Sequence, residues 1–123
     1  MATETAHQEH EKRAGNNQSL FRAVNERVSD LNKAHGLWVT VSDWICECAD
    51  ETCTERIELT AQQYERVRRN RTHFVVAPSA EHVVFDEERV VEQNERYWVV
   101  SKVGEAASVA MRLDPRSRDD GRA

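Results

Sequence analysis

The sequence predicts a small α+β protein of one domain, in which an N-terminal helix and a short second helix pack on a small antiparallel sheet. Three observations favour this class. Apolar residues recur with helical spacing near the N-terminus, short stretches of alternating or β-branched residues follow, and three cysteines lie within eight positions. The chain has 123 residues, which is enough for one hydrophobic core.

The composition restricts the classes of partner. The chain carries 22 acidic and 17 basic side chains, for a net charge of −5, which disfavours a general phosphate-binding surface. We therefore expect another protein as the partner, with nucleic acid not favoured, and the oligomeric state stays open. No apolar run approaches the roughly 20 residues that span a bilayer, and residues 1–15 lack the apolar middle of a signal peptide. We expect no membrane contact and a cytoplasmic location.

The N-terminal part predicts a tail followed by a helix. Residues 1–16 contain no large apolar side chain after Met1, so we expect a disordered tail. Asn17 is suited to an N-cap, and Gly36 to a stop. Between them we expect an amphipathic helix over residues 18–35 whose buried stripe consists of Leu20, Val24, Val28 and Leu31.

The next segments predict a hairpin and a second helix. Residues 37–45 alternate in part, and residues 56–60 alternate with Ile57 inward, so we expect Cys46–Cys48 to pair with Ile57–Leu59. Thr60 and Gln63 fit a capping box that starts a helix over residues 61–69. We expect that helix to bury Tyr64 and Val67 and to turn its arginines to water, namely Arg66, Arg68 and Arg69.

The C-terminal half predicts further strands and a last helix. Residues 74–77 form a buried-type strand that Pro78 ends, and residues 89–92 and 97–100 form a hairpin. A short helix over residues 105–112 follows. Residues 114–123 carry Pro115 and mixed charge, so we expect a second disordered tail. The folded α+β domain is thus expected over residues 17–113.

The cysteines predict a metal site. Cys46 and Cys48 lie two apart, so an extended chain turns both sulfurs to one face, and Cys53 returns after a polar bend. An odd number of cysteines in a reducing compartment is typical of metal ligands or of a reactive thiol rather than of a disulfide framework. Structural Zn²⁺ takes four ligands, commonly three cysteines and one histidine. We expect His82 as the fourth ligand, with His73 as the weaker candidate; the alternative is three ordinary buried thiols.

Several segments resemble a family of small bacterial proteins of uncharacterised function. They are the run from Cys46 to Thr60, with Cys-x-Cys-x4-Cys followed by Glu-Arg-Ile-Glu-Leu-Thr, then Phe74–Pro78, His82-Val83, Arg89–Glu92 and the opening helix at Phe21–Arg27. The resemblance covers about residues 20–110. It implies that the histidine after Ala-Pro belongs to the cysteine site, although the family usually reads Gly-His where this chain has Ser79-Ala80-Glu81-His82. The family implies no established activity.

The predicted function follows from a closed ligand set. Three cysteines and one histidine leave no open position on the metal, so we expect a non-catalytic, zinc-stabilised interaction or regulatory module. A zinc-thiolate redox sensor is the alternative. Less favoured are a zinc enzyme with an open fourth position and nucleic-acid binding through Arg66–Arg71. We expect the acidic residues near the cysteines to face solvent, namely Glu47, Asp50 and Glu51.

Overall fold

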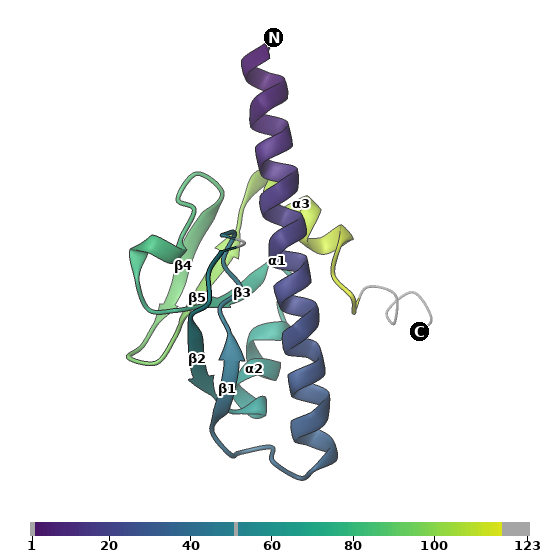
Figure 1. Ribbon diagram of the computed structural model, residues 1–123, viewed down its shortest axis with the longest axis vertical. Coiled ribbons are helices and arrows are strands. Elements are labelled where there is room, and N and C mark those ends of the chain that lie inside the picture. The colour runs from purple at the N-terminus through teal and green to yellow at the C-terminus, as the bar shows by residue number, and fades with distance from the viewer. Residues whose placement is uncertain (1, 51, 117–123) are drawn as a thin grey trace.

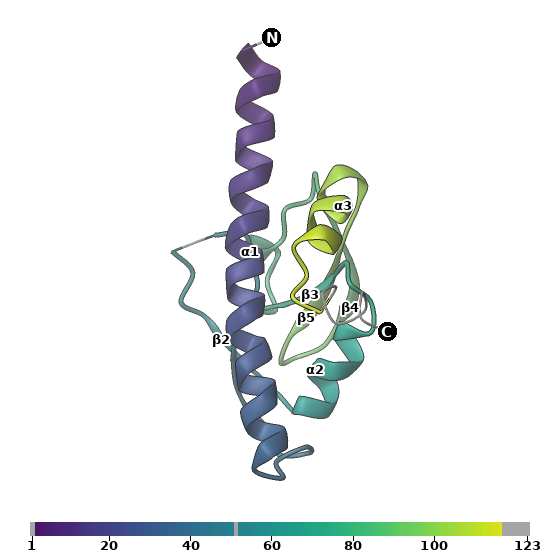
Figure 2. The ribbon, with the colours of Figure 1, turned by 90° about the vertical axis from the view of Figure 1, so that its right-hand side faces the viewer.

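The computed structural model describes residues 2–50 and 52–116, with side chains described from Asn17 onward. Within these ranges the chain forms three α-helices, one short 3-10 helix and two antiparallel sheets, so the predicted α+β class is confirmed (Figure 1). The long first helix contacts both of the others (Figure 2). None of the described helices is both long enough and apolar enough to cross a membrane.

Helix α1 spans Ala2–Ala34, so it begins well before the predicted start at residue 18. Its first turns project beyond the sheets (Figure 1). The segment predicted as a tail is rich in alanine, glutamate, glutamine, lysine and arginine, all good helix formers, and contains no proline. The absence of large apolar residues from this segment argues against its packing on the core, but it does not prevent the segment from forming a helix. Asn17 therefore lies inside the helix and is not its N-cap.

The buried face of α1 is polar, which corrects the predicted apolar stripe. The buried residues are Gln18, Arg22, Asn25, Ser29 and Asn32, whereas Leu20, Val24 and Leu31 are exposed and Val28 is partly buried. The physical reason is that α1 packs on backbone at strand ends. Asn25 Nδ2 donates to Ile45 O at 2.8 Å, and the Arg22 guanidinium donates to the carbonyls of Arg71 and His73.

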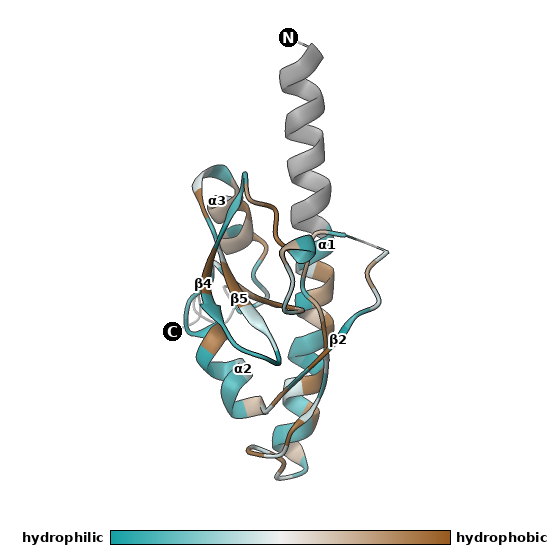
Figure 3. Cartoon of the chain, turned by 90° about the vertical axis from the view of Figure 1, so that its left-hand side faces the viewer, coloured by the Kyte–Doolittle hydropathy of each residue, from teal (hydrophilic) through white to brown (hydrophobic). Residues whose placement is uncertain are grey.

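Strands β1 (Ser42–Ile45) and β2 (Arg56–Leu59) form the smaller sheet. They pair antiparallel, with Ser42 opposite Leu59 and Ile45 opposite Arg56. The predicted pairing of Cys46–Cys48 with Ile57–Leu59 is therefore wrong in register, because the cysteines follow β1. Residues 37–41 form a loop with four exposed apolar side chains, those of Leu37, Trp38, Val39 and Val41. The loop after α1 is partly brown, the colour of hydrophobic residues, in Figure 3.

Helix α2 (Ala61–Arg68) begins with the predicted capping box. Thr60 Oγ1 accepts from the Gln63 backbone N–H at 3.0 Å, and Gln63 Oε1 accepts from the Thr60 N–H at 2.8 Å. Tyr64 and Val67 are buried as predicted, and the Tyr64 ring stacks on Trp44 with the centroids 4.6 Å apart.

The larger sheet has the order β3-β5-β4, formed by His73–Val76, Trp98–Lys102 and Glu88–Gln93. Both of its neighbouring pairs are antiparallel, and β4 with β5 is the predicted C-terminal hairpin. Helix α3 (Gly104–Arg112) then packs beside α1 and β5, close to its predicted position. The short 3-10 helix Ala80–His82 lies in the connection from β3 to β4.

Ion pairs fix the end of the described chain to α1 and α2. Arg68, predicted to face water, is buried, and its guanidinium contacts Glu26 at 2.6 Å and Asp114 at 2.5 Å. Arg116 bonds both Glu26 and Glu65, at 2.9 and 2.7 Å. Residues 114–116 thus extend the packed region beyond residue 113, because they neutralise charges on two helices. The remainder of the predicted tail, 117–123, lies outside the described residues.

Replacing Asp114 with alanine should lower the free energy of unfolding by about 3 kcal/mol at neutral pH, since it leaves the buried Arg68 with less compensating charge. Burial alone would raise the pKa of Asp114, but hydrogen bonds, first from Arg68, hold it below 3.8. A carboxylate with a lowered folded-state pKa stabilises above its unfolded pKa and loses that effect on acidification. The difference in unfolding free energy between D114A and wild type, measured with urea, should therefore shrink as the pH falls below about 4 and disappear once it passes the lowered pKa of Asp114. Asp86→Ala, at an exposed aspartate, is the matched control; a D114A deficit independent of pH would contradict the ionic explanation.

Candidate metal centre

Two cysteines leave the small hairpin on the same side of the chain. The Cys46 N–H still donates to Glu55 O at 3.1 Å, which extends the β1–β2 ladder by one bond. The next N–H, from Glu47, donates instead to Val75 O on β3 at 2.8 Å. The backbone of residues 46–47 is therefore hydrogen-bonded to both sheets. The side chains of Cys46 and Cys48, two residues apart, are both buried.

A side-chain-stabilised turn returns the third cysteine. Asp50 Oδ1 accepts from the Thr52 backbone N–H at 2.9 Å and from its hydroxyl at 2.7 Å. The Cys53 N–H then donates to Asp50 O at 3.1 Å. This is the Asx-type geometry that aspartate favours in turns, and it brings Cys53 back to the first two cysteines.

His82 completes the cluster from the other side. It ends the 3-10 helix, in which Ser79 Oγ caps the start by accepting from the Glu81 N–H at 3.2 Å. His82 Nδ1 lies 3.6 Å from Cys46 Sγ and 3.7 Å from Cys53 Sγ. The four potential ligand atoms of Cys46, Cys48, Cys53 and His82 lie within 4.8 Å of one another. All three cysteines are free thiols.

The cluster lowers the pKa of one of its three cysteines, Cys48. The Cys46 thiol and Cys48 share a hydrogen bond, which raises the pKa of Cys46 and lowers the pKa of Cys48 to about 5. The Ala77 backbone N–H donates to Cys46 Sγ at 3.2 Å. The thiolate is the form that binds metals. The lowered pKa of Cys48 and the Ala77 N–H that donates to Cys46 Sγ therefore both favour metal binding at this cluster.

Glu47 faces the core, which corrects the prediction that it faces solvent. Its side chain is fully buried, and its carboxylate accepts hydrogen bonds from Asn25 Nδ2 at 2.9 Å, Tyr64 OH at 3.0 Å and the Val75 N–H at 3.1 Å. Burial raises its pKa. The alternation that predicts Cys46 and Cys48 on one face also predicts residue 47 on the opposite face, so the signal was present in the sequence.

The other candidate residues lie outside the cluster. His73 is on β3, where burial and then the neighbouring Arg22 lower its pKa, and His35 is exposed beyond the end of α1. Asp50 is exposed as predicted, and Glu51 is outside the described residues. In the predicted basic patch, Arg68 is buried and Arg66 bonds Glu92 at 3.1 Å, so its charges are partly neutralised.

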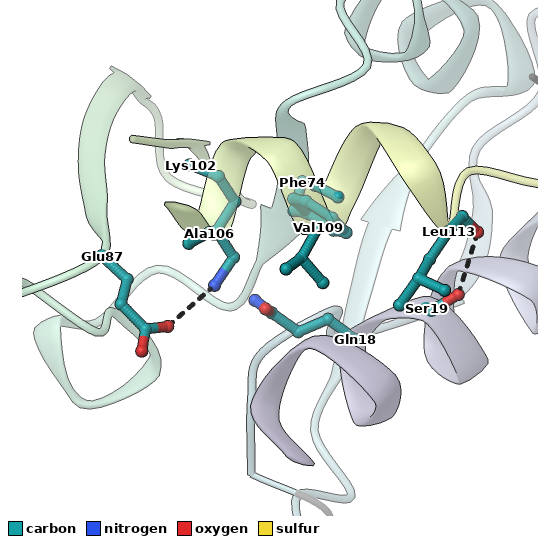
Figure 4. A pocket seen from close by; sticks show the side chains of 9 residues that line it. Gln18, Ser19, Phe74, Glu87, Lys102, Ala106, Val109 and Leu113 are labelled. Carbon is teal, nitrogen blue, oxygen red and sulfur yellow. Dashed lines mark hydrogen bonds and ion pairs between the residues drawn. The ribbon is translucent and has the colours of Figure 1, made fainter. Parts of the chain in front are cut away.

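One concavity lies beside the cysteine–histidine cluster, and another lies away from it. One, of about 220 Å³, opens beside it and is lined by Cys48, His82, Asp50 and Glu81 among others. The other lies between α1 and α3 and measures about 10 Å³, the space of about one water molecule (Figure 4). Lys102 borders it and contacts Glu88 at 2.9 Å and Glu87 at 3.5 Å. The second cavity is too small for a substrate.

No protein-family model, curated protein or solved structure matches this chain. The interpretation of the cluster therefore depends on its own geometry and chemistry.

Proposed function

We propose that Cys46, Cys48, Cys53 and His82 bind one Zn²⁺ ion. The observation that carries the proposal is the spacing of the ligand atoms. With Zn–S near 2.3 Å and Zn–N near 2.0–2.1 Å, a tetrahedral ion places sulfur and nitrogen about 3.6 Å apart. The His82 nitrogen lies 3.6 and 3.7 Å from two of the sulfurs. Three sulfurs and one imidazole are also a ligand set that zinc commonly takes.

The role that this ligand set supports is structural. Four protein ligands fill a tetrahedron and leave no position for a metal-bound water, so the site favours stabilisation over catalysis. The ligands come from the end of the β1–β2 hairpin and from the connection between β3 and β4. A bound ion thus cross-links the two sheets of a small domain, where a limited core benefits most from an extra constraint.

The module is proposed to act by binding another protein in the cytoplasm. Large apolar side chains are exposed on the outer face of α1 and in the loop after it: Leu20, Val24, Leu31, Leu37, Trp38, Val39 and Val41. Exposed apolar residues gathered in this way are typical of interaction surfaces. A reducing compartment keeps the three thiols available for zinc. The helix, not the basic residues of α2, is the surface that supports a partner.

A zinc-thiolate redox sensor is the second candidate. Cys53 and His82 are only half-buried, and the concavity beside them exposes part of the cluster to small oxidants. Under this alternative, mild peroxide releases zinc and a thiol reductant restores it. A purely structural site instead retains its zinc until the protein unfolds.

The test is the metal content of protein purified without added zinc. Wild type should carry about one zinc ion per chain, and Cys48→Ser and His82→Ala should each lose most of it after dialysis against a weak chelator. His73→Ala is the matched control, because His73 lies on β3 away from the cluster and should leave the zinc content unchanged. Metal-free wild type would contradict zinc binding. Full zinc retention in H82A would contradict the fourth ligand and favour an open site.

A further inference from the structure

The outer edge of β2 presents backbone groups that point away from β1. In antiparallel ladders, hydrogen-bonded pairs alternate with pairs whose N–H and C=O groups point outward. Cys46 bonds Glu55 across the ladder, whereas Ile45 turns its N–H and C=O to the Asn25 side chain, at 3.0 and 2.8 Å. Ile45 pairs with Arg56, and Asp43 with Glu58. The N–H and C=O groups of Arg56 and Glu58 therefore point away from β1.

These four groups have no hydrogen-bond partner among the described residues. Among the described residues, strand β2 pairs only with β1, and it lies on the side of β1 that faces away from α1 (Figure 1). Arg56 and Glu58 are exposed, whereas Ile57 and Leu59 are buried in the core. The core therefore fixes the orientation of the strand, and the unpaired edge is held ready for another strand.

We propose that a second copy of this chain pairs with this edge, antiparallel and around a two-fold axis at Ile57. In that register Arg56 lies opposite Glu58 of the second copy, and Glu58 lies opposite Arg56 of the second copy. All four outward backbone groups of each chain are then used in hydrogen bonds. The two small sheets become one four-stranded sheet across the dimer, in an isologous interface of the kind that two-fold symmetry produces.

The side-chain charges select this register. Arg56 and Glu58 lie on the same face of β2, because they are two residues apart. Centred on Ile57, the pairing brings an arginine and a glutamate together twice. Centred on Arg56 or on Glu58, it would instead place two like charges opposite each other, which destabilises strand pairing. Charges on an edge strand usually prevent association; here their order makes the edge complementary to itself.

The test is a charge exchange followed by analytical ultracentrifugation over a range of protein concentrations. Wild type should dimerise, and Arg56→Glu or Glu58→Arg alone should weaken the dimer at least about tenfold, because each places like charges opposite each other twice. The double exchange R56E/E58R should restore the dimer. An equimolar mixture of the two single variants should form a heterodimer, because each then supplies the charge that the other lacks.

Two further measurements make the test specific. Amide hydrogen exchange at Arg56 and Glu58 should slow as the wild-type concentration rises, while exchange elsewhere on the surface is unchanged. Glu95→Arg, the same charge change at an exposed position on the β4–β5 turn, should leave the dimer intact. Wild type that remains monomeric up to about 1 mM would overturn the proposal. So would a dimer that survives both single reversals, or one that the double exchange fails to restore.

Discussion

Removing the proposed Zn²⁺ ion with a strong chelator is expected to lower the midpoint of thermal unfolding by about 15 °C. A metal bound only by the folded state, at a free concentration about 1,000 times its dissociation constant, stabilises that state by about 4 kcal/mol. For a chain of this size, each kcal/mol shifts the midpoint by about 3–5 °C. The expected cause is local: once the proposed ion is removed, the four ligand residues would no longer link the end of the β1–β2 hairpin to the β3–β4 connection. Circular dichroism during heating measures the shift.

The Cys48→Ser variant separates loss of zinc from other effects of the chelator. It should unfold near the midpoint of chelated wild type, and the chelator should shift it no further. Returning zinc to the chelated wild type should restore the higher midpoint, since metal binding and folding are coupled. A wild-type midpoint that is the same with and without the chelator, in protein shown to have lost its zinc, would contradict a structural role.

Local signals in the sequence predicted the local structure well. The capping box of Thr60 and Gln63 was predictable because both partners lie within one turn of the helix they start. The C-terminal hairpin and α3 follow from short patterns bounded by breakers, and the structure confirms them. The clustering of Cys46, Cys48 and Cys53 also follows from their spacing. His82 is joined to them by the fold, and its choice over His73 depended on the loop after Pro78.

Long-range polar contacts were the part that sequence patterns did not reveal. The apolar residues of α1 repeat with helical spacing, yet the helix buries Arg22 and Asn25, because strand-end carbonyls need donors that only polar side chains supply. Arg68 was expected in water for the same reason that Asp114 was expected in a tail. Considered without its partner, each charged residue is of a type that usually lies on the surface. The ion pair that buries both of them joins residues 46 positions apart in the chain. A periodicity rule contains no information about such partners.

Glu47 lies between two of the clustered cysteines in sequence and also accepts long-range hydrogen bonds. Replacing it in Glu47→Ala is expected to lower the free energy of unfolding by about 3–5 kcal/mol. The substitution leaves three buried donors, from Asn25, Tyr64 and Val75, without their common acceptor. It also releases the residue between Cys46 and Cys48, so zinc affinity should fall about 10–100-fold, as for other groups that orient metal ligands. Urea unfolding and competition with a colorimetric chelator measure the two effects.

Glu55→Ala is the matched control for that experiment. Glu55 is exposed on the partner side of the same hairpin, and its backbone bond to Cys46 survives the substitution. Its unfolding free energy should stay within about 0.5 kcal/mol of wild type. Glu47→Gln adds a second comparison: the amide keeps one acceptor but turns its NH2 group toward donors already in place, so it should restore only part of the loss. Full stability and full zinc affinity in E47A would mean that the three hydrogen bonds contribute little, and that the cysteines are positioned by the backbone of β1 and β3 alone.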